Sequence, residues 1–160
     1  MQPDNALAFL DDTTAMELAL TEARRAGAGG EVPVGAVVVV DSRAVAAAGN
    51  QREATGDPTA HAEIVALRAA AARVGSWRLE GATLYTTLEP CPMCAGALVA
   101  ARVARVVFAT ADPKAGACGS LYNLCVDPRL NHEVEVVPGV CEVEAAALLQ
   151  EWFSARRTAR

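Results

Sequence analysis

Two short motifs combine the side chains from which a catalytic metal site is built. The segment PTAHAEIVAL contains His61, one of only 2 histidines in the chain, with Glu63 two positions later. The segment EPCPMCAGA places Cys91 and Cys94 three positions apart. Imidazole nitrogen and thiolate sulfur are preferred zinc ligands, and a nearby carboxylate can carry protons. The motifs therefore predict a zinc site with an acid–base group beside it.

Taken alone, the C-x-x-C pair has other interpretations. Its spacing equals one helical turn, so both thiols can face one point in a redox pair, a four-cysteine zinc site or a packed core. The other cysteines, Cys118, Cys125 and Cys141, form no second C-x-x-C, and we interpret them as small buried hydrophobic residues. An incomplete metal site remains, and only His61 or His132 can supply nitrogen. We expect His132 to be structural or peripheral.

The position of a helix start decides whether His61 and Glu63 can act together. In mid-helix, residues two apart point about 200° away from each other. In the first turn, both side chains can reach a metal beyond the helix end. The preceding GDPT favours an extended approach, and we expect Thr59 to be the N-cap. Because the C-x-x-C pair also opens a predicted helix, two positively polarised helix N-termini would converge on the metal.

The expected cofactor is one Zn²⁺ per subunit, bound by His61, Cys91 and Cys94. Three protein ligands leave the fourth tetrahedral position for water, whose pKa zinc lowers toward about 7. Glu63, which need not bind the metal, can take up and return the proton. The two motifs HAE and PCPMC resemble the signature of zinc-dependent deaminases, H-x-E followed by P-C-x-x-C.

Alternating helices and strands must position these motifs. A capping box of Thr14 and Glu17 is expected to open the first helix. We predict helices over residues 14–27, 60–75, 91–101 and 142–157, strands over 32–40, 44–49, 81–89, 102–110 and 133–139, and loops over 50–59 and 111–132. The first two strands form a hairpin, and strands then alternate with helices. This order predicts an α/β fold, a mixed sheet with helices on both faces.

Composition is consistent with one cytoplasmic domain over residues 1–160, with disorder expected only within residues 1–12 and 158–160. The chain has five cysteines, an odd number, and it is long enough to fold without disulfides, so we expect reduced thiols. The longest apolar run, VGAVVVV, is too short to cross a membrane. A net charge of −5 argues against a nucleic acid partner, but the final WFSARRTAR contains three arginines and no acidic residue.

The wider sequence resembles the family of bacterial tRNA-specific adenosine deaminases. The resemblance covers about residues 13–157 and is carried by EVPVGAVVV, DPTAHAEI, ATLYTTLEPCPMCAGA, DPKAGA and LNH. It implies the cytidine deaminase-like fold, a three-layer αβα sandwich with a five-stranded mixed sheet. It also implies a homodimer that binds a tRNA anticodon stem-loop and converts the wobble adenosine of an arginine tRNA, with anticodon ACG, to inosine.

The resemblance further implies a set of substrate-binding residues. Asn50 would hydrogen-bond the flipped-out base, and Val34 and Leu88 would form part of the pocket wall. The residues that would contact neighbouring anticodon nucleotides are Asp112, Lys114 and Asn131. On the last helix, Phe153 and Arg156 would meet the RNA near the pocket mouth.

Simpler structural interpretations exist for several of these residues. Asn50 and Asp112 stand where turn residues are expected. Phe153 continues an apolar stripe of the last helix, which is typical of a core position. Arg156 can neutralise the carboxyl end of that helix.

Two other functions are compatible with the metal motifs. A deaminase of free nucleobases or nucleosides, such as guanine or cytosine, would use the same metal set and tolerate a net negative charge. A non-catalytic zinc- or RNA-binding module would have no need of Glu63. The spacing of the ligands does not discriminate adenine from cytosine, so that choice depends on the resemblance.

Overall fold

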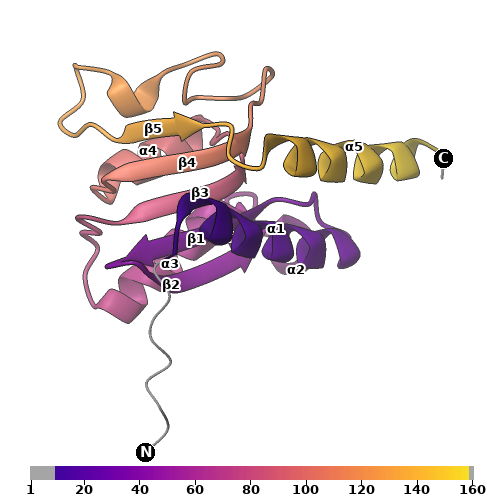
Figure 1. The fold of residues 1–160 in the computed structure, drawn as a ribbon, viewed down its shortest axis with the longest axis horizontal. Helices are drawn as coiled ribbons and strands as arrows, with labels where there is room; N and C mark the ends of the chain where they lie inside the picture. The colour runs from indigo at the N-terminus through magenta and orange to yellow at the C-terminus, as the bar shows by residue number, and fades with distance from the viewer. Residues whose placement is uncertain (1–9, 159–160) are drawn as a thin grey trace, which may run out of the picture.

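The computed structural model describes residues 10–158 and contains one five-stranded sheet with helices on both faces (Figure 1). The strands follow the order β2-β1-β3-β4-β5, where β1 is antiparallel to β2 and β3, and the pairs β3–β4 and β4–β5 are parallel. The strands are β1 (Gly35–Val40), β2 (Arg43–Gly49), β3 (Thr83–Leu88), β4 (Arg105–Thr110) and β5 (Glu135–Pro138). The helices are α1 (Asp12–Ala28), α2 (Arg52–Thr55), α3 (Ala62–Val74), α4 (Pro92–Ala100), α5 (Glu142–Thr158) and the 3₁₀ helix η1 (Leu124–Val126). The predicted mixed sheet is confirmed.

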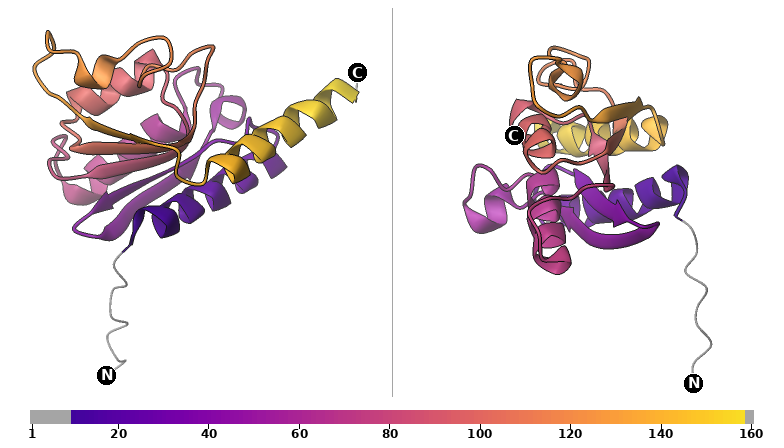
Figure 2. Two further views of the ribbon diagram at one scale, coloured as in Figure 1. Left: turned by 45° about the horizontal axis from the view of Figure 1, so that its top comes forward. Right: turned by 90° about the vertical axis from the view of Figure 1, so that its left-hand side faces the viewer.

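Alternate side chains of β1 face the two helical layers, as the period of two in a strand requires. Ala36 and Val38 pack in the cluster that includes α3 and α4, whereas Val37 and Val39 pack in the cluster that includes α1. Figure 2 shows α1 and α5 together on one face of the sheet, opposite α3 and α4. Because both faces are covered, the strand GAVVVV contains no polar residue.

Several of the predicted site residues lie at the carboxyl ends of β2, β3 and β4. These three strands run in the same direction, since β1 is antiparallel to both of its neighbours. Asn50, Cys91 and Asp112 lie just beyond the ends of β2, β3 and β4, respectively. The amino end of α3 brings His61 to the same edge, and α5 extends outward beyond it (Figure 1). Ligand sites of open α/β sheets are found at this edge.

The structure corrects two predicted helix starts. Asp11, rather than Thr14, is the N-cap of α1, and its carboxylate accepts a hydrogen bond from the Thr14 backbone N–H at 2.7 Å. Aspartate is as good an N-cap as threonine, so the true helix start lies three residues earlier. His61, rather than Thr59, is the N-cap of α3. The Thr59 backbone N–H instead donates a hydrogen bond to the Asp57 carboxylate at 2.8 Å, which closes a turn before the helix.

Strand and loop boundaries also differ from the prediction. β1, β3, β4 and β5 begin two or three residues later than expected. Before β1, Pro33 has no N–H for a ladder, and before β4, Arg102 has a φ of 61°. The predicted loops contain α2 and η1. Residues 10–12 and 158, within the ends where disorder was expected, are part of the described structure, and residues 1–9 and 159–160 lie outside it. Within the described residues, no helix is long and apolar enough to cross a membrane.

Candidate active site

His61, Cys91 and Cys94 meet at the carboxyl edge of the sheet. His61 is the N-cap of α3, Cys91 is the N-cap of α4, and Cys94 lies one turn further along α4. His61 Nδ1 lies 3.6 Å from Cys91 Sγ and 3.5 Å from Cys94 Sγ. The three ligand atoms all lie within 4.8 Å of one another. The predicted convergence of two helix N-termini is confirmed.

The spacing and chemistry of these donors fit zinc. Tetrahedral zinc, with bonds of about 2.3 Å to sulfur and about 2.1 Å to nitrogen, separates those two ligands by about 3.6 Å. Two thiolate sulfurs and one imidazole nitrogen are a typical zinc donor set. Three protein ligands leave one coordination position for water, as in catalytic sites.

The pKa values of the two thiols are shifted in opposite directions. Contact with Cys94 lowers the pKa of Cys91 to about 4 and outweighs the effect of burial, and His61 contributes in the same direction. The same contact with Cys91, together with burial, raises the pKa of Cys94. Zinc ligation requires both thiolates, so binding of zinc at neutral pH releases the proton of Cys94.

Glu63 lies beside the ligand cluster, in the first turn of α3, and is only 3% exposed. The Thr86 hydroxyl donates a hydrogen bond to Glu63 Oε1 at 2.7 Å, and the Cys94 thiol donates one to Oε2 at 3.2 Å. A carboxylate fixed in this way next to the reaction centre has the geometry of a general acid–base group. Sequence reasoning missed Thr86, because its partner lies 23 residues away and no local pattern indicates it.

A cavity of about 160 Å³ opens beside these residues. Pockets for drug-sized ligands occupy about 300–1,000 Å³, so this cavity has room for a single heterocyclic ring system. Four predicted substrate residues are brought together in its wall. They are Val34, Asn50, Leu88 and Asp112, and the lining also includes Val32, Arg52, His61, Ala62, Glu63, Glu89, Cys91 and Ala115.

Three predicted substrate residues lie near α5, outside this cavity. Lys114 and Phe153 line a groove of about 300 Å³. Phe153 is 44% exposed, so the interpretation as a core residue is wrong. Arg156 lines a separate groove with Asn50, donates a hydrogen bond to the Gly30 carbonyl at 3.0 Å and stacks on the ring of its neighbour Trp152.

Asn131 is not brought to the cavity. It is exposed, and the adjacent His132 contacts the Val103 carbonyl through Nε2 at 2.7 Å, near the amino end of β4. This position is at the opposite end of the sheet from the metal ligands. The same contact agrees with the expectation that His132 is structural or peripheral.

The remaining cysteines lie apart from the metal ligands. Cys118 and Cys125 are buried, with their sulfurs 3.6 Å apart, which confirms their interpretation as small core residues. Cys141 is half-buried and has a φ of 59° just before α5 begins.

Comparisons with known proteins agree with this site. Residues 10–110 match the family described as the cytidine and deoxycytidylate deaminase zinc-binding region. Over 142 residues, the chain is 50% identical to a tRNA-specific adenosine deaminase of Bacillus subtilis, which covers 89% of this chain and 88% of the relative. The chain belongs to the tRNA-specific adenosine deaminase family. Membership in a zinc-binding deaminase family, with His61, Cys91 and Cys94 in place, confirms the predicted zinc cofactor.

Solved structures of deaminases share this fold. One, from biochemical and structural studies of A-to-I editing by tRNA:A34 deaminases at the wobble position of transfer RNA, is 47% identical, with a TM-score of 0.83 over 86% of this chain and 99% of that chain. A guanine deaminase of Nitrosomonas europaea is 26% identical, with a TM-score of 0.77 over 89% of this chain and 84% of that chain. This chain therefore has the predicted cytidine deaminase-like sandwich. Of these two structures, the tRNA:A34 deaminase has the higher sequence identity to it.

Proposed function

We propose that this chain is a zinc-dependent hydrolase that converts adenosine to inosine at the wobble position of a tRNA anticodon loop. The expected substrate is an arginine tRNA with anticodon ACG. The observation that carries the proposal is the position of Glu63 beside three converging zinc ligands in a cavity with room for one base. A cytoplasmic location is part of the proposal, because all five cysteines are free thiols.

Asn50 is proposed to recognise the base. Its side-chain oxygen accepts a hydrogen bond from the Arg52 N–H at 3.2 Å, and its side-chain nitrogen lies 3.5 Å from the Val32 carbonyl. These contacts fix the direction of a side chain in the cavity wall. Val34 and Leu88 supply apolar wall beside it. A base must leave its stack to enter such a cavity, which favours single-stranded loops.

The catalytic proton transfers are assigned to Glu63. Zinc, when bound by His61, Cys91 and Cys94, supplies a Lewis acid that acidifies the attacking water. Glu63 takes up a proton from that water and delivers it to N1 of adenine, as oxygen bonds to C6. Glu63 then takes the remaining proton from the new C6 hydroxyl and passes it to the departing amine, so that the C6–N bond breaks as the C6 carbonyl forms. Adenosine and water thus give inosine and ammonia, and the carboxylate is regenerated.

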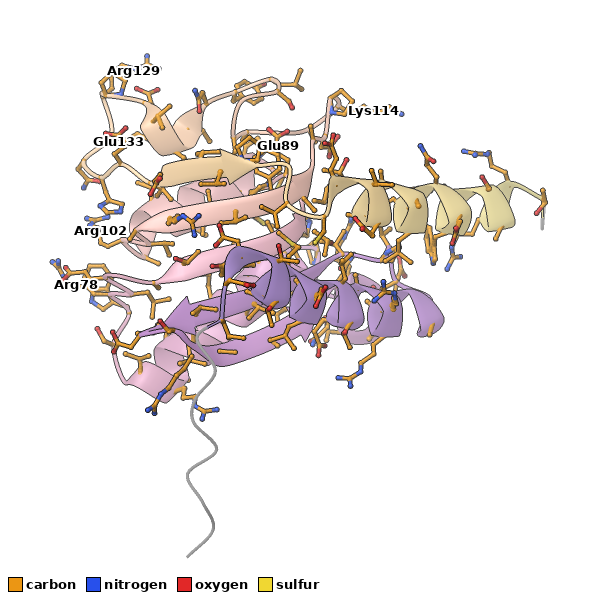
Figure 3. All side chains as sticks on the ribbon, in the orientation of Figure 1. Arg78, Glu89, Arg102, Lys114, Arg129 and Glu133 are labelled. Carbon is orange, nitrogen blue, oxygen red and sulfur yellow. The ribbon has the colours of Figure 1, made fainter. Side chains whose placement is uncertain are left out.

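Residues near α5 are proposed to bind the nucleotides next to the target base. Phe153 offers an exposed ring for stacking, and Lys114 and Arg157 line the same groove with positive charge. Figure 3 shows Lys114 on its loop beside the start of α5. Although the chain as a whole has a net charge of −5, this groove is locally basic. Local charge of this kind suits phosphate contacts.

We also propose that two copies of the chain associate through α3 and α4. The sequence of α4, PMCAGALVA, contains no polar or charged residue, yet Met93, Gly96 and Ala100 are exposed. A helix that is apolar on all sides is normally covered on all sides. Ala100, together with Ala97, lines an apolar groove of about 390 Å³ between α3 and α4. The small side chains allow a second copy of the same helix to approach closely.

The decisive experiment is incubation of the zinc-loaded protein with an anticodon stem-loop of arginine tRNA. Mass spectrometry of the digested RNA should show the mass change of an amino group replaced by oxygen at the wobble position. Free guanine, cytosine and their nucleosides serve as competing substrates. Ammonia release from a free base, with no change in the RNA, would instead support the nucleobase deaminase. A zinc-loaded protein that releases no ammonia from any of these substrates would support the non-catalytic module.

A further inference from the structure

Glu89 is a buried carboxylate to which the proposed reaction assigns no role. It lies between β3 and the metal ligand Cys91, separated from that ligand only by Pro90, and it is 2% exposed. Within residues 10–158, no cationic side chain forms a salt bridge with it. A buried charge without a cationic partner is costly unless hydrogen bonds replace its solvation.

Backbone and hydroxyl donors of a single loop, residues 112–120, provide this solvation. Glu89 Oε1 accepts hydrogen bonds from the Asp112 N–H at 3.1 Å and from the Ser120 hydroxyl. Oε2 accepts from the Cys118 N–H at 3.0 Å and the Ser120 N–H at 3.1 Å. All four groups are donors, so together they replace the water that would otherwise solvate both oxygens of a carboxylate.

Gly116 shows how closely the 112–120 loop encloses the carboxylate. A Cβ atom at Gly116 would lie 2.3 Å from Glu89 Oε2, which is far inside van der Waals contact. The Ala117 N–H also donates to the Pro90 carbonyl at 2.8 Å. The loop is therefore wound around Glu89 and attached to the segment that leads directly to Cys91.

The same loop presents two of the proposed RNA contacts. The Asp112 carboxylate accepts hydrogen bonds from the backbone N–H groups of Lys114 at 3.0 Å and Ala115 at 3.2 Å, which forms the turn that carries Lys114 outward. Figure 3 shows Glu89 and Lys114 at the carboxyl ends of the strands, on the side from which α5 extends. Displacement of this loop would move both proposed contacts relative to the metal.

We propose that Glu89 is a positioning residue, which fixes the RNA-contacting 112–120 loop relative to the metal ligand Cys91. This role depends on the proposed function, since it concerns affinity for the anticodon loop. Among the residues that the structure describes, only those of the loop donate hydrogen bonds to Glu89. We therefore assign it an action through Asp112 and Lys114 and no part in the proton transfers.

The variant Glu89→Gln tests the proposal with little change in volume. Its amide NH₂ would face backbone N–H donors in place of one acceptor oxygen, which leaves donors unsatisfied. We expect KM for the stem-loop to rise about tenfold or more, with kcat changed less than about threefold and zinc content unchanged. Ser120→Ala, which removes a single hydroxyl donor, should raise KM in the same direction by a smaller factor.

The matched control is Tyr85→Phe, which deletes the hydrogen bond of another side chain from the β3 segment. Tyr85 lies on the face of the sheet that α1 covers. The Tyr85 hydroxyl donates to Asp12 at 2.8 Å, far from the loop. This variant should lose stability but keep the wild-type KM. A general structural role for Glu89 would instead make the two variants behave alike.

A double-mutant cycle with Lys114→Ala shows whether Glu89 acts through the loop. The two substitutions should be non-additive, so the double variant should raise KM little more than the larger single change. Additive effects, or a wild-type KM in both Glu89→Gln and Ser120→Ala, would overturn the inference. If Glu89→Gln does not fold, the double-mutant cycle of Ser120→Ala with Lys114→Ala tests the inference by the same criterion, the additivity of the changes in KM. If the wild-type protein is inactive on the stem-loop, the proposed function itself is overturned, and this result is distinct from the KM outcomes that would overturn the role of Glu89.

Discussion

The Thr86 hydroxyl lies 2.7 Å from Glu63 Oε1 and donates a hydrogen bond to it, which joins the central strand of the sheet to the carboxylate of α3. Both side chains are buried, Thr86 fully and Glu63 to 3% exposure. The bond therefore fixes one carboxylate oxygen and leaves the other facing Cys94 and the cavity. As the proposed proton carrier, Glu63 must keep one orientation through two transfers, and the bond from Thr86 would provide that restraint.

Replacement of Thr86 by valine should lower kcat for deamination by about tenfold, because it deletes the donor while preserving shape and burial. Zinc content should stay at the wild-type level, since the Thr86 hydroxyl bonds Glu63 and the Leu88 carbonyl rather than His61, Cys91 or Cys94. The conservative variant Thr86→Ser keeps the hydroxyl and should retain most of the activity. Equal kcat values for the valine and serine variants would show that the hydroxyl does not orient Glu63.

Replacement of Glu63 by glutamine should abolish most deamination while leaving zinc bound. General acid–base groups contribute about 10²–10⁴-fold to rate, and glutamine cannot carry the proton. Since Glu63 is not one of the three converging ligands, metal content measured by elemental analysis should be unchanged. Wild-type-like turnover by this variant would remove Glu63 from the chemistry.

Replacement of His61 by alanine should lower zinc content, because the remaining ligands are two thiols on one helix turn. The matched control is His132→Ala, which removes the only other histidine in the sequence and leaves the ligand cluster intact. Elemental analysis of both variants after dialysis provides the measurement. Full zinc occupancy in the His61 variant, or an equal loss in both variants, would contradict the assignment.

The sequence was informative where the chemistry is local. His61 and Glu63 lie two residues apart, and Cys91 and Cys94 lie three apart, so each pair was visible as a motif, and both pairs occupy helix starts as predicted. The exact cap was not predictable, because Thr59 is as suitable an N-cap as the residue that the fold selects. A metal ligand at the N-cap position is a tertiary requirement that a local rule does not include.

Residues that act through distant partners escaped prediction. The contacts of Thr86 with Glu63 and of Glu89 with Ser120 span 23 and 31 residues, and they depend on how α3 and the 112–120 loop pack against β3. A glutamate next to a cysteine motif gives no sign that a loop will wind around it. Asn131, in contrast, was assigned from the resemblance, and the fold places it away from the cavity, beside the His132 contact near the amino end of β4.

Replacement of Asp12 by asparagine should destabilise the protein by about 1 kcal/mol at neutral pH, as expected for a partly exposed ion pair. Asp12 accepts hydrogen bonds from Arg105 and Tyr85, and the Arg105 hydrogen bond is the main cause of its lowered pKa. A lowered folded-state pKa means that this stabilisation is complete above the ordinary value of 3.8 and is lost as the pH falls through the folded value. Urea unfolding of both proteins at pH 7 and below pH 3 should show the difference shrink on acidification, and a pH-independent difference would contradict it.

Replacement of Ala100 by glutamate should convert the proposed dimer to a monomer. Ala100 is exposed on α4 and lines the apolar groove between α3 and α4, so a second copy packed there would bury the new carboxylate without a partner. Ala72→Glu is the matched control, because Ala72 is exposed on α3 but does not line the groove. Size-exclusion chromatography with light scattering should give a dimer for the wild type and the control, and a monomer for Ala100→Glu. A monomeric wild type, or a dimeric Ala100 variant, would show that this face does not join two copies.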